Sequence, residues 1–219
     1  MRTGLEPGAA VLLEGSLACM IRFLTVMHDK DIRDALRVEL REKYKGVPDT
    51  AVIDELAIAG GRNRIDLALV NGVLHGFELK SDFDSLSRLA EQVRGYGTVC
   101  DSVTLVVGER HLRRAIDVVP NWWGILVVRY GKRHPVFRCL KHSQTNPSVE
   151  PIAVARLLRR SEAANLFRES GYGEPDCRAS RRQLCDFIAD HVELDLLRRC
   201  VRDRIRERRS AAIPRSCGD

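Results

Sequence analysis

The sequence lacks the short motifs that assign several large enzyme classes directly. It has no P-loop, no Gly-x-Ser-x-Gly motif, no Gly-x-Gly-x-x-Gly motif and no internal repeat. These absences argue against P-loop nucleotide hydrolases, enzymes with a serine nucleophile elbow, dinucleotide-binding folds and repeat architectures. Any chemistry of this chain must therefore come from another arrangement of residues.

Paired cysteine motifs are also missing. The seven cysteines include no Cys-x-x-Cys pair, and their number is odd. This pattern is typical of free thiols in a reducing compartment, so we expect a cytoplasmic protein. His134, Cys139 and His142 are close enough in sequence to suggest zinc, but their spacing fits no familiar site and a fourth ligand is missing. A zinc site is therefore not expected.

Long uninterrupted apolar runs are absent as well. Residues 9–27 are fairly apolar, but Glu14 and Arg22 interrupt them, so the stretch is too short and too charged to span a bilayer. The acidic Glu6 and the lack of a clear cleavage site argue against a secretory signal. We expect residues 1–26 to be an N-terminal extension outside the folded region, and we expect no membrane partner.

Length and charge indicate the broad organisation. The 219 residues are enough for one α/β domain, expected at residues 27–140, followed by a helical, basic C-terminal region at residues 141–219. The formal net charge is +6 and the sequence pI is about 9.1. This balance is compatible with a polyanionic partner but does not prove one.

Apolar periodicity predicts alternating strands and helices. The predicted strands are residues 50–58, 65–70, 73–79, 102–107, 124–130 and 133–140. The predicted helices are residues 29–44, 81–96, 152–170, 180–191 and 192–209, with a short helix inside 108–119. Trp122 and Trp123 precede a predicted strand, and we expect them to fill the edge of the sheet rather than to stack on bases.

Residues 62–96 carry the charged residues that suggest chemistry. Asp66 lies in one predicted strand, and Glu78 and Lys80 lie in the next, on the same side because strand side chains alternate. Asp66 reaches that side only if the intervening loop has an odd length. We therefore predict an odd register, with a loop at residues 70–72 and Asp66 opposite Gly76.

Two carboxylates on one side of a hairpin suggest a divalent metal. The carboxylates of Asp66 and Glu78 and the carbonyl of Leu79 are hard oxygen ligands that suit Mg²⁺ or Mn²⁺. Lys80 beside the metal would orient or activate a water, and the metal would stabilise charge on a phosphate. The alternative is a surface hairpin whose charged residues are solvated or paired.

The wider pattern resembles a known family. The run from DKDIRDAL through ELAI, RIDLALVNG and GFELKSDFDSLSRLAEQV to PNWWG resembles the sce7726 family of bacterial proteins, and with it the PD-(D/E)XK nuclease superfamily. The similarity covers residues 29–124 well and the C-terminal helices loosely. It implies a restriction-endonuclease-like core, with a mixed sheet of four to six strands flanked by helices and a helical C-terminal extension. It also implies a Mg²⁺- or Mn²⁺-dependent nuclease that hydrolyses phosphodiester bonds, expected in DNA.

The same resemblance implies further site residues. Glu55 matches the family pattern as a third metal-binding carboxylate, and Glu39 on the first helix is the alternative; either is otherwise a surface acid paired with an arginine. Gln92 shares a helix stripe with Arg88, where the resemblance implies a contact with the scissile phosphate or a water. A merely structural role for Gln92 is equally open.

The C-terminal region leaves rival functions open. Residues 152–219 hold 15 Arg, no Lys and 11 Asp or Glu. Basic helices suit a nucleic-acid backbone, although a solvated helix with interleaved acids is the favoured interpretation. One rival function is a non-catalytic nucleic-acid-binding or regulatory protein that retains the nuclease fold. Another is an interaction module whose helical tail docks a partner protein. A homodimer is expected only by analogy with enzymes of this fold.

Overall fold

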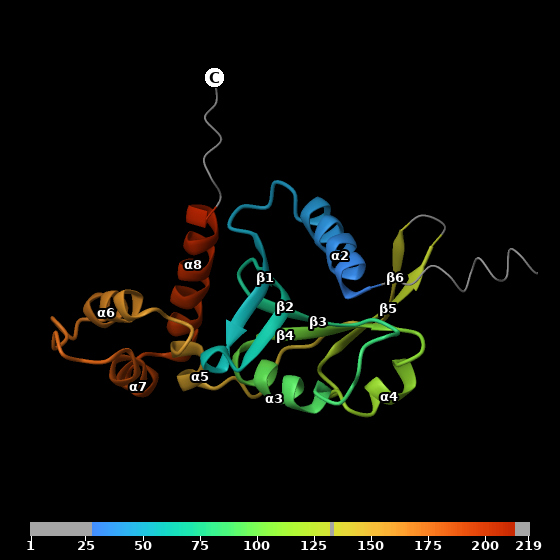
Figure 1. Cartoon of the computed structure of the whole chain (residues 1–219). Helices are drawn as coiled ribbons and strands as arrows, with labels where there is room; N and C mark the ends of the chain where they lie inside the picture. Colours follow the sequence, from blue (N-terminus) through green and yellow to red (C-terminus); the bar gives the residue numbers. More distant parts are fainter. Residues whose placement is uncertain (1–27, 132–133, 213–219) are drawn as a thin grey trace, which may run out of the picture.

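The computed structural model describes residues 28–131 and 134–212, and its centre is a six-stranded sheet in the order β1-β2-β3-β4-β5-β6 (Figure 1). The first three strands are antiparallel, β3 to β5 are parallel, and β6 runs antiparallel to β5. The strands span Ala51–Ile58 (β1), Asn63–Val70 (β2), Leu74–Lys80 (β3), Ser102–Gly108 (β4), Gly124–Tyr130 (β5) and Pro135–Lys141 (β6). The predicted mixed sheet flanked by helices is confirmed, and the predicted extension at residues 1–26 lies outside the described residues.

The β2–β3 turn sets the register of the candidate site. Val70 pairs with Leu74, so three residues, Asn71–Val73, form the connection. Gly72 has a φ of +92°, a left-handed conformation that glycine adopts without steric cost. The predicted odd parity of the hairpin is therefore confirmed, although the loop lies one residue later than expected.

The exact partner of the aspartate differs from the prediction. Gly76 pairs with Ala68 rather than with Asp66. The regular pairing of β2 with β3 ends one residue short of Asp66 and Glu78. The charge of Glu78 helps to raise the pKa of Asp66, so the two carboxyl groups lie close together.

Helix α2 (Asp29–Lys43) covers one face of the sheet, above it in Figure 1. Its apolar residues recur every four positions, so Ile32, Leu36 and Leu40 form one buried stripe. They share a cluster with the sheet residues Leu67, Leu69, Phe77, Leu79, Val106 and Val128. The predicted helix at residues 29–44 is confirmed.

Helices α3 (Leu89–Val99) and α4 (Leu112–Ile116) lie on the opposite face (Figure 1). Helix α3 begins at Leu89 and not at the predicted residue 81. The reason is a local turn in which Asp84 Oδ2 accepts hydrogen bonds from the backbone N–H and the hydroxyl of Ser81, both at 2.6 Å. Such side-chain bonds compete with the helical pattern of the backbone.

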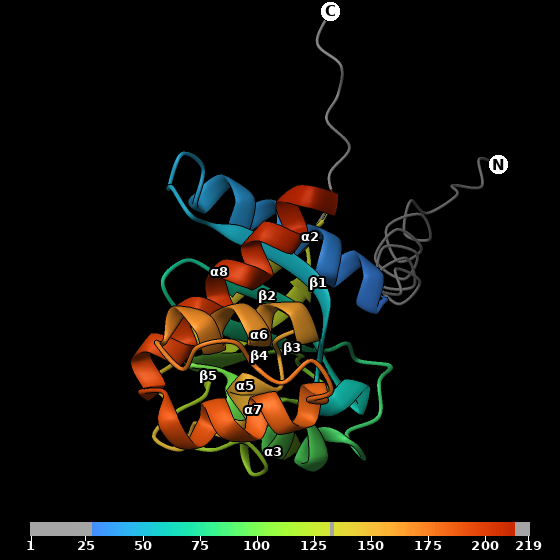
Figure 2. The ribbon, with the colours of Figure 1, turned by 90° about the vertical axis from the view of Figure 1, so that its left-hand side faces the viewer.

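Four C-terminal helices complete the fold: α5 (Pro151–Ala155), α6 (Arg160–Glu169), α7 (Arg181–His191) and α8 (Leu194–Ala212). Figure 2 shows them grouped at one side of the sheet, with α8 near β1. Their apolar residues belong to the same cluster as the sheet, which includes Val103 and Leu105 of β4 and Leu197 and Val201 of α8. The predicted boundary at residue 140 therefore crosses a continuous core and stays a prediction.

The predicted helix at residues 152–170 is divided in two. The carbonyl of Leu157 accepts a hydrogen bond from Arg208 Nη2 at 3.0 Å, and the carbonyl of Leu158 accepts one from Arg181 Nε at 2.7 Å. These arginines come from α8 and α7, so local periodicity does not reveal the break.

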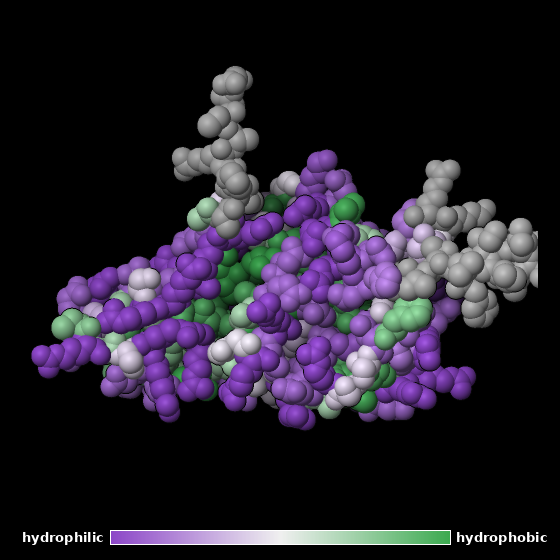
Figure 3. Space-filling view, in the orientation of Figure 1, coloured by the Kyte–Doolittle hydropathy of each residue, from purple (hydrophilic) through white to green (hydrophobic). Residues whose placement is uncertain are grey.

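The surface is mostly hydrophilic, but an apolar hollow lies between α8 and α2 (Figure 3). A cavity of about 540 Å³ lies there, and its lining combines the apolar Leu40, Tyr44, Val47 and Val52 with the polar Arg41, Thr50, Arg209 and Ser210. Within residues 28–131 and 134–212, no helix combines the length and the apolar character that a bilayer crossing requires.

Candidate functional site

A cavity of about 400 Å³ collects most of the residues that the sequence analysis selected. We call it the acid–lysine cavity. It lies between the first turns of α2 and α3, beside β1, β2 and β3. Its lining includes Glu55, Asp66, Leu79, Lys80 and Gln92, whereas Glu78 is not a lining residue.

Glu78 is fully buried, and both of its carboxylate oxygens are engaged inside the protein. Lys80 Nζ lies 2.5 Å from Oε1, and the hydroxyl of Tyr96 donates to Oε2 at 2.5 Å. Strand β3 presents Glu78 and Lys80 on the side where α3 places Tyr96. A buried carboxylate requires such partners, so this group is a packed polar network within the core.

Asp66 makes two hydrogen bonds at a point where the regular pairing of the strands is interrupted. Its backbone N–H donates to the hydroxyl oxygen of Tyr96 at 3.1 Å, and its Oδ2 accepts from the backbone N–H of Leu79 at 2.8 Å. The pairing between β1 and β2 is interrupted here, opposite Glu55. Burial, followed by the nearby charge of Glu78, raises the pKa of Asp66 to about 8. The carboxyl group is therefore mainly protonated at neutral pH.

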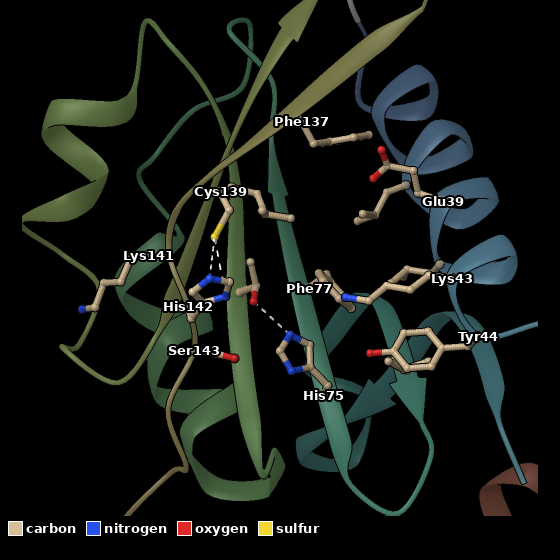
Figure 4. A pocket seen from close by; sticks show the side chains of 15 residues that line it. Glu39, Lys43, Tyr44, His75, Phe77, Phe137, Cys139, Lys141, His142 and Ser143 are labelled. Carbon is tan, nitrogen blue, oxygen red and sulfur yellow. Dashed lines mark hydrogen bonds between the residues drawn. The ribbon is translucent and has the colours of Figure 1, made fainter. Parts of the chain in front are cut away.

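Of the two candidates for a third carboxylate, only Glu55 reaches this cavity. It lies within β1 at a φ of +52°, which is uncommon for a residue other than glycine. Its carboxylate is paired with Arg33 and, at 3.9 Å, with Arg64. Glu39 is exposed on α2 and lines a different cavity (Figure 4). The structure does not bring Glu39 to Asp66, so the alternative with Glu39 has no geometric support.

Gln92 lines the acid–lysine cavity from α3, and its Oε1 atom is buried with no hydrogen-bond partner among the described residues. Arg64 and Arg88 lie at the rim, and both side chains are exposed.

The predicted ligands Asp66, Glu78 and Leu79 fit a divalent metal poorly. A metal requires ionised carboxylates with accessible oxygens. Both oxygens of Glu78 are bonded, to Lys80 and Tyr96, and Oδ2 of Asp66 is bonded to the N–H of Leu79. In the part of the chain that the structure describes, no group of three or more His, Cys, Asp or Glu residues is placed to hold a metal ion. Binding of Mg²⁺ or Mn²⁺ stays a prediction.

A larger cavity of about 580 Å³ lies between α2 and strands β3 to β6 (Figure 4). His75 is bonded there to the hydroxyls of Ser102 at 2.6 Å and Thr104 at 2.9 Å. Burial lowers the pKa of His75 to about 4, so the imidazole is neutral and holds β3 to β4. Cys139 Sγ lies 3.7 Å from His142 Nδ1. This cavity holds none of the Asp66 network.

Tyr96 is the central residue that the sequence analysis missed. It is the last residue of the predicted helix at residues 81–96, yet its hydroxyl links Glu78 to Asp66. Its ring is fully buried beside Trp123, with 5.8 Å between the ring centroids. The core-packing prediction for Trp123 is thereby confirmed. A tyrosine at a core position requires a polar partner, which was the available signal.

Comparison with known proteins indicates a phage family. The family model described as Bacteriophage P4 protein cII matches residues 25–213. Protein cII of Enterobacteria phage P4 is 25% identical over 183 residues, which cover 84% of this chain and 68% of that protein. No solved structure matches.

These matches correct the sequence-based assignment. The placement in the sce7726 family and the PD-(D/E)XK superfamily is wrong, and so is the metal-dependent nuclease that it implied. The structure supplies a physical reason for the error. The pattern of Asp66, Glu78 and Lys80 also arises when a strand hairpin buries two carboxyl groups and pairs one of them with a lysine.

Proposed function

Because the chain belongs to the family of bacteriophage P4 protein cII, we propose that it is a regulatory protein that binds nucleic acid without cleaving it. A cytoplasmic location, DNA as the nucleic acid and a homodimer belong to this proposal. The restriction-endonuclease-like form of the sheet stays a prediction.

The observation that carries the proposal is the closed network of Glu78. General-base and metal chemistry need a carboxylate that faces the substrate. Glu78 instead has no exposed surface, and Lys80 and Tyr96 occupy its two oxygens. Removing either partner of this buried ion pair would cost about 3–5 kcal/mol. The network stabilises the sheet at the floor of a binding cavity and supports no turnover.

The walls of the acid–lysine cavity support binding. Arg62, Arg64 and Arg88 are exposed at its edge, where guanidinium groups reach phosphate oxygens. Gln92 lines the same cavity, and its side-chain amide carries an acceptor and two donors that suit the edge of a nucleobase. Contacts of the arginines with the phosphate backbone position the nucleic-acid strand, and a contact of the amide with a base adds selectivity.

Fluorescence anisotropy with labelled single-stranded and duplex DNA tests the proposal. We expect binding that weakens steeply with salt, because phosphate contacts release counterions. We expect the affinity to be the same in EDTA and in Mg²⁺, and denaturing gels to show intact DNA in both. Replacement of Arg64 and Arg88 together by Glu should weaken binding by about tenfold or more, since it reverses two phosphate contacts.

A matched control distinguishes this site from general charge effects. Arg113 and Arg114 are exposed on α4, outside the acid–lysine cavity. Their double replacement by Glu changes the net charge equally and should weaken binding much less. Cleavage in Mg²⁺ that Lys80→Met abolishes would refute a non-catalytic protein. Absence of any DNA binding would instead favour an interaction module, for which the apolar hollow between α8 and α2 is the available surface.

A further inference from the structure

A second charged cavity, of about 470 Å³, lies between the η1 turn (Ala59–Gly61) after β1 and the C-terminal helices. We call it the arginine cavity. Five arginines line it, and no aspartate or glutamate is among its described lining residues. They are Arg156, Arg159, Arg160, Arg181 and Arg208. It shares only Gly61 with the acid–lysine cavity.

Two of the five guanidinium groups are neutralised by carboxylates. Arg208 Nη2 lies 2.6 Å from Glu162, and Arg156 Nη2 lies 3.3 Å from Asp186. The other three arginines form no ion pair with any described residue. Three exposed arginines without a described carboxylate partner leave this cavity with a positive potential that attracts anions.

Two of the three unbalanced arginines, Arg160 and Arg181, are held in place by hydrogen bonds to backbone carbonyls. Arg160 donates from Nη2 to the carbonyl of Cys177 at 2.8 Å and from Nε to the carbonyl of Ala179 at 3.1 Å. Arg181 donates from Nε to the carbonyl of Leu158 at 2.7 Å. Carbonyl bonds orient a guanidinium without cancelling its charge. Each group has five N–H donors, so several remain for a ligand.

The rest of the lining leaves room for an anion. Gly60 and Gly61 have φ values of +70° and +89°, and a Cβ atom added to either would meet nothing within 4 Å. Their backbone conformation favours glycine, and the space in front of them is open. The volume lies in the range of small-molecule sites, about 300–1,000 Å³.

We propose that the arginine cavity binds the polyphosphate group of a small molecule, such as a nucleoside di- or triphosphate. Three unbalanced guanidinium groups match the charge of a pyrophosphate or triphosphate chain. A nucleic-acid strand brings only one charge per phosphodiester, spaced along its backbone. Arginine also binds phosphate oxygens in pairs, which suits adjacent phosphate groups. This site is separate from the nucleic-acid surface proposed above and does not depend on it.

Isothermal titration of the full-length protein with sodium pyrophosphate, ATP and adenosine tests the proposal. Pyrophosphate and ATP should bind, whereas adenosine should not. Arg159 is the informative position, because its exposed side chain has no described hydrogen-bond partner and its loss leaves no internal bond broken. We expect Arg159→Gln to weaken pyrophosphate at least tenfold with no change in melting temperature.

Matched variants test whether the loss of pyrophosphate binding is specific to the arginine cavity. Arg178 is exposed in the α6–α7 connection outside the cavity, so Arg178→Gln should retain full pyrophosphate affinity. Replacement of Arg64 and Arg88 by Glu should also retain it, which separates this site from the nucleic-acid surface. Absence of pyrophosphate binding would overturn the proposal, as would an equal loss in Arg159→Gln and Arg178→Gln. It would also be overturned if Arg159→Gln weakened only duplex DNA.

Discussion

At the scale of single residues, Tyr96 and Lys80 allow the buried carboxylate of Glu78 to lie beside the half-buried Asp66. The hydroxyl of Tyr96 contacts Glu78 and the backbone of Asp66, and Lys80 supplies the positive charge. A buried carboxylate that loses its partner is left uncompensated in a region of low dielectric constant. The network therefore predicts changes in stability rather than changes in catalysis.

Lys80→Met tests the ion pair directly. The Lys80 and Glu78 side chains are 7% and 0% exposed, so the charge left on Glu78 has no access to water. We expect the free energy of unfolding in urea to fall by about 3 kcal/mol, the lower end for a broken buried pair. Adding Glu78→Gln should recover part of this loss, because it removes the uncompensated charge.

The control for this variant is Lys45→Met. The Lys45 side chain is 76% exposed and lies 3.7 Å from Glu42, so its loss should change stability by no more than about 0.5 kcal/mol. A Lys80→Met protein as stable as the wild type would show that the pair is not needed in the core.

Asp66 predicts a pH dependence of stability. Its pKa is raised to about 8 in the folded protein, above the ordinary value of 3.8. The folded state therefore binds the proton more tightly than the unfolded state. This contribution is complete below the unfolded pKa and is lost as the pH rises through about 8. Over this window, stability should fall by up to about 1.4 kcal/mol per pH unit.

Asp66→Asn isolates that effect from other titrating groups. The amide oxygen retains an acceptor for the Leu79 N–H but carries no charge. Urea unfolding between pH 5 and pH 9 should therefore give a flatter profile for the variant, which becomes the more stable protein at pH 9. Parallel profiles for the two proteins would contradict the raised pKa.

At the scale of elements, one carboxylate links α8 to the sheet in addition to the apolar packing of that helix. Asp101, before β4, lies 3.2 Å from Arg202 and 3.3 Å from Arg198 of α8. The same carboxylate accepts the backbone N–H of Leu74, at the start of β3, at 2.6 Å. Asp101 thus joins α8 to two strands.

Asp101→Ala should weaken this attachment. Its side chain is only 13% exposed, so we expect a loss of about 2 kcal/mol and faster amide hydrogen exchange in α8. Asp195→Ala is the control, because Asp195 also pairs with Arg198 but is 82% exposed. Unchanged exchange in α8 after Asp101→Ala would show that apolar packing alone holds the helix.

The bounds of α2 and α3 show where prediction from the sequence succeeds and where it fails. The stripe of Ile32, Leu36 and Leu40 defined α2 correctly, because period and burial agree along one helix. The start of α3 was predicted too early, because Ser81 and Asp84 form a turn that periodicity does not reveal. Local apolar pattern is reliable where no side chain competes for the backbone.

At the scale of the whole molecule, the sheet and the C-terminal helices form one cooperative unit. A single apolar cluster contains β4 residues and α8 residues together. A fragment of residues 28–150 would expose the part of the sheet that the helices cover. We expect this fragment to lack a cooperative urea transition in tryptophan fluorescence, whereas the full chain unfolds in one step.

A fragment of residues 28–212 is the control for that experiment. If residues 1–26 are an extension, as predicted, this control should unfold with the same free energy as the full chain. A cooperative transition in the 28–150 fragment would instead establish the boundary at residue 140 and make residues 141–219 a separate unit.

The sequence by itself determined the local features: most strands and helices, the turn at Asn71–Val73 to within one residue, and the odd parity that makes Asp66 and Glu78 neighbours. These follow from periodicity and backbone preferences over a few residues. The tertiary structure alone decided that the hydroxyl of Tyr96 occupies one oxygen of Glu78. It also decided that arginines from α6, α7 and α8 meet beside the η1 turn. Residues this far apart are brought together by packing, so their pKa values, partners and charge balance exist only in the folded chain.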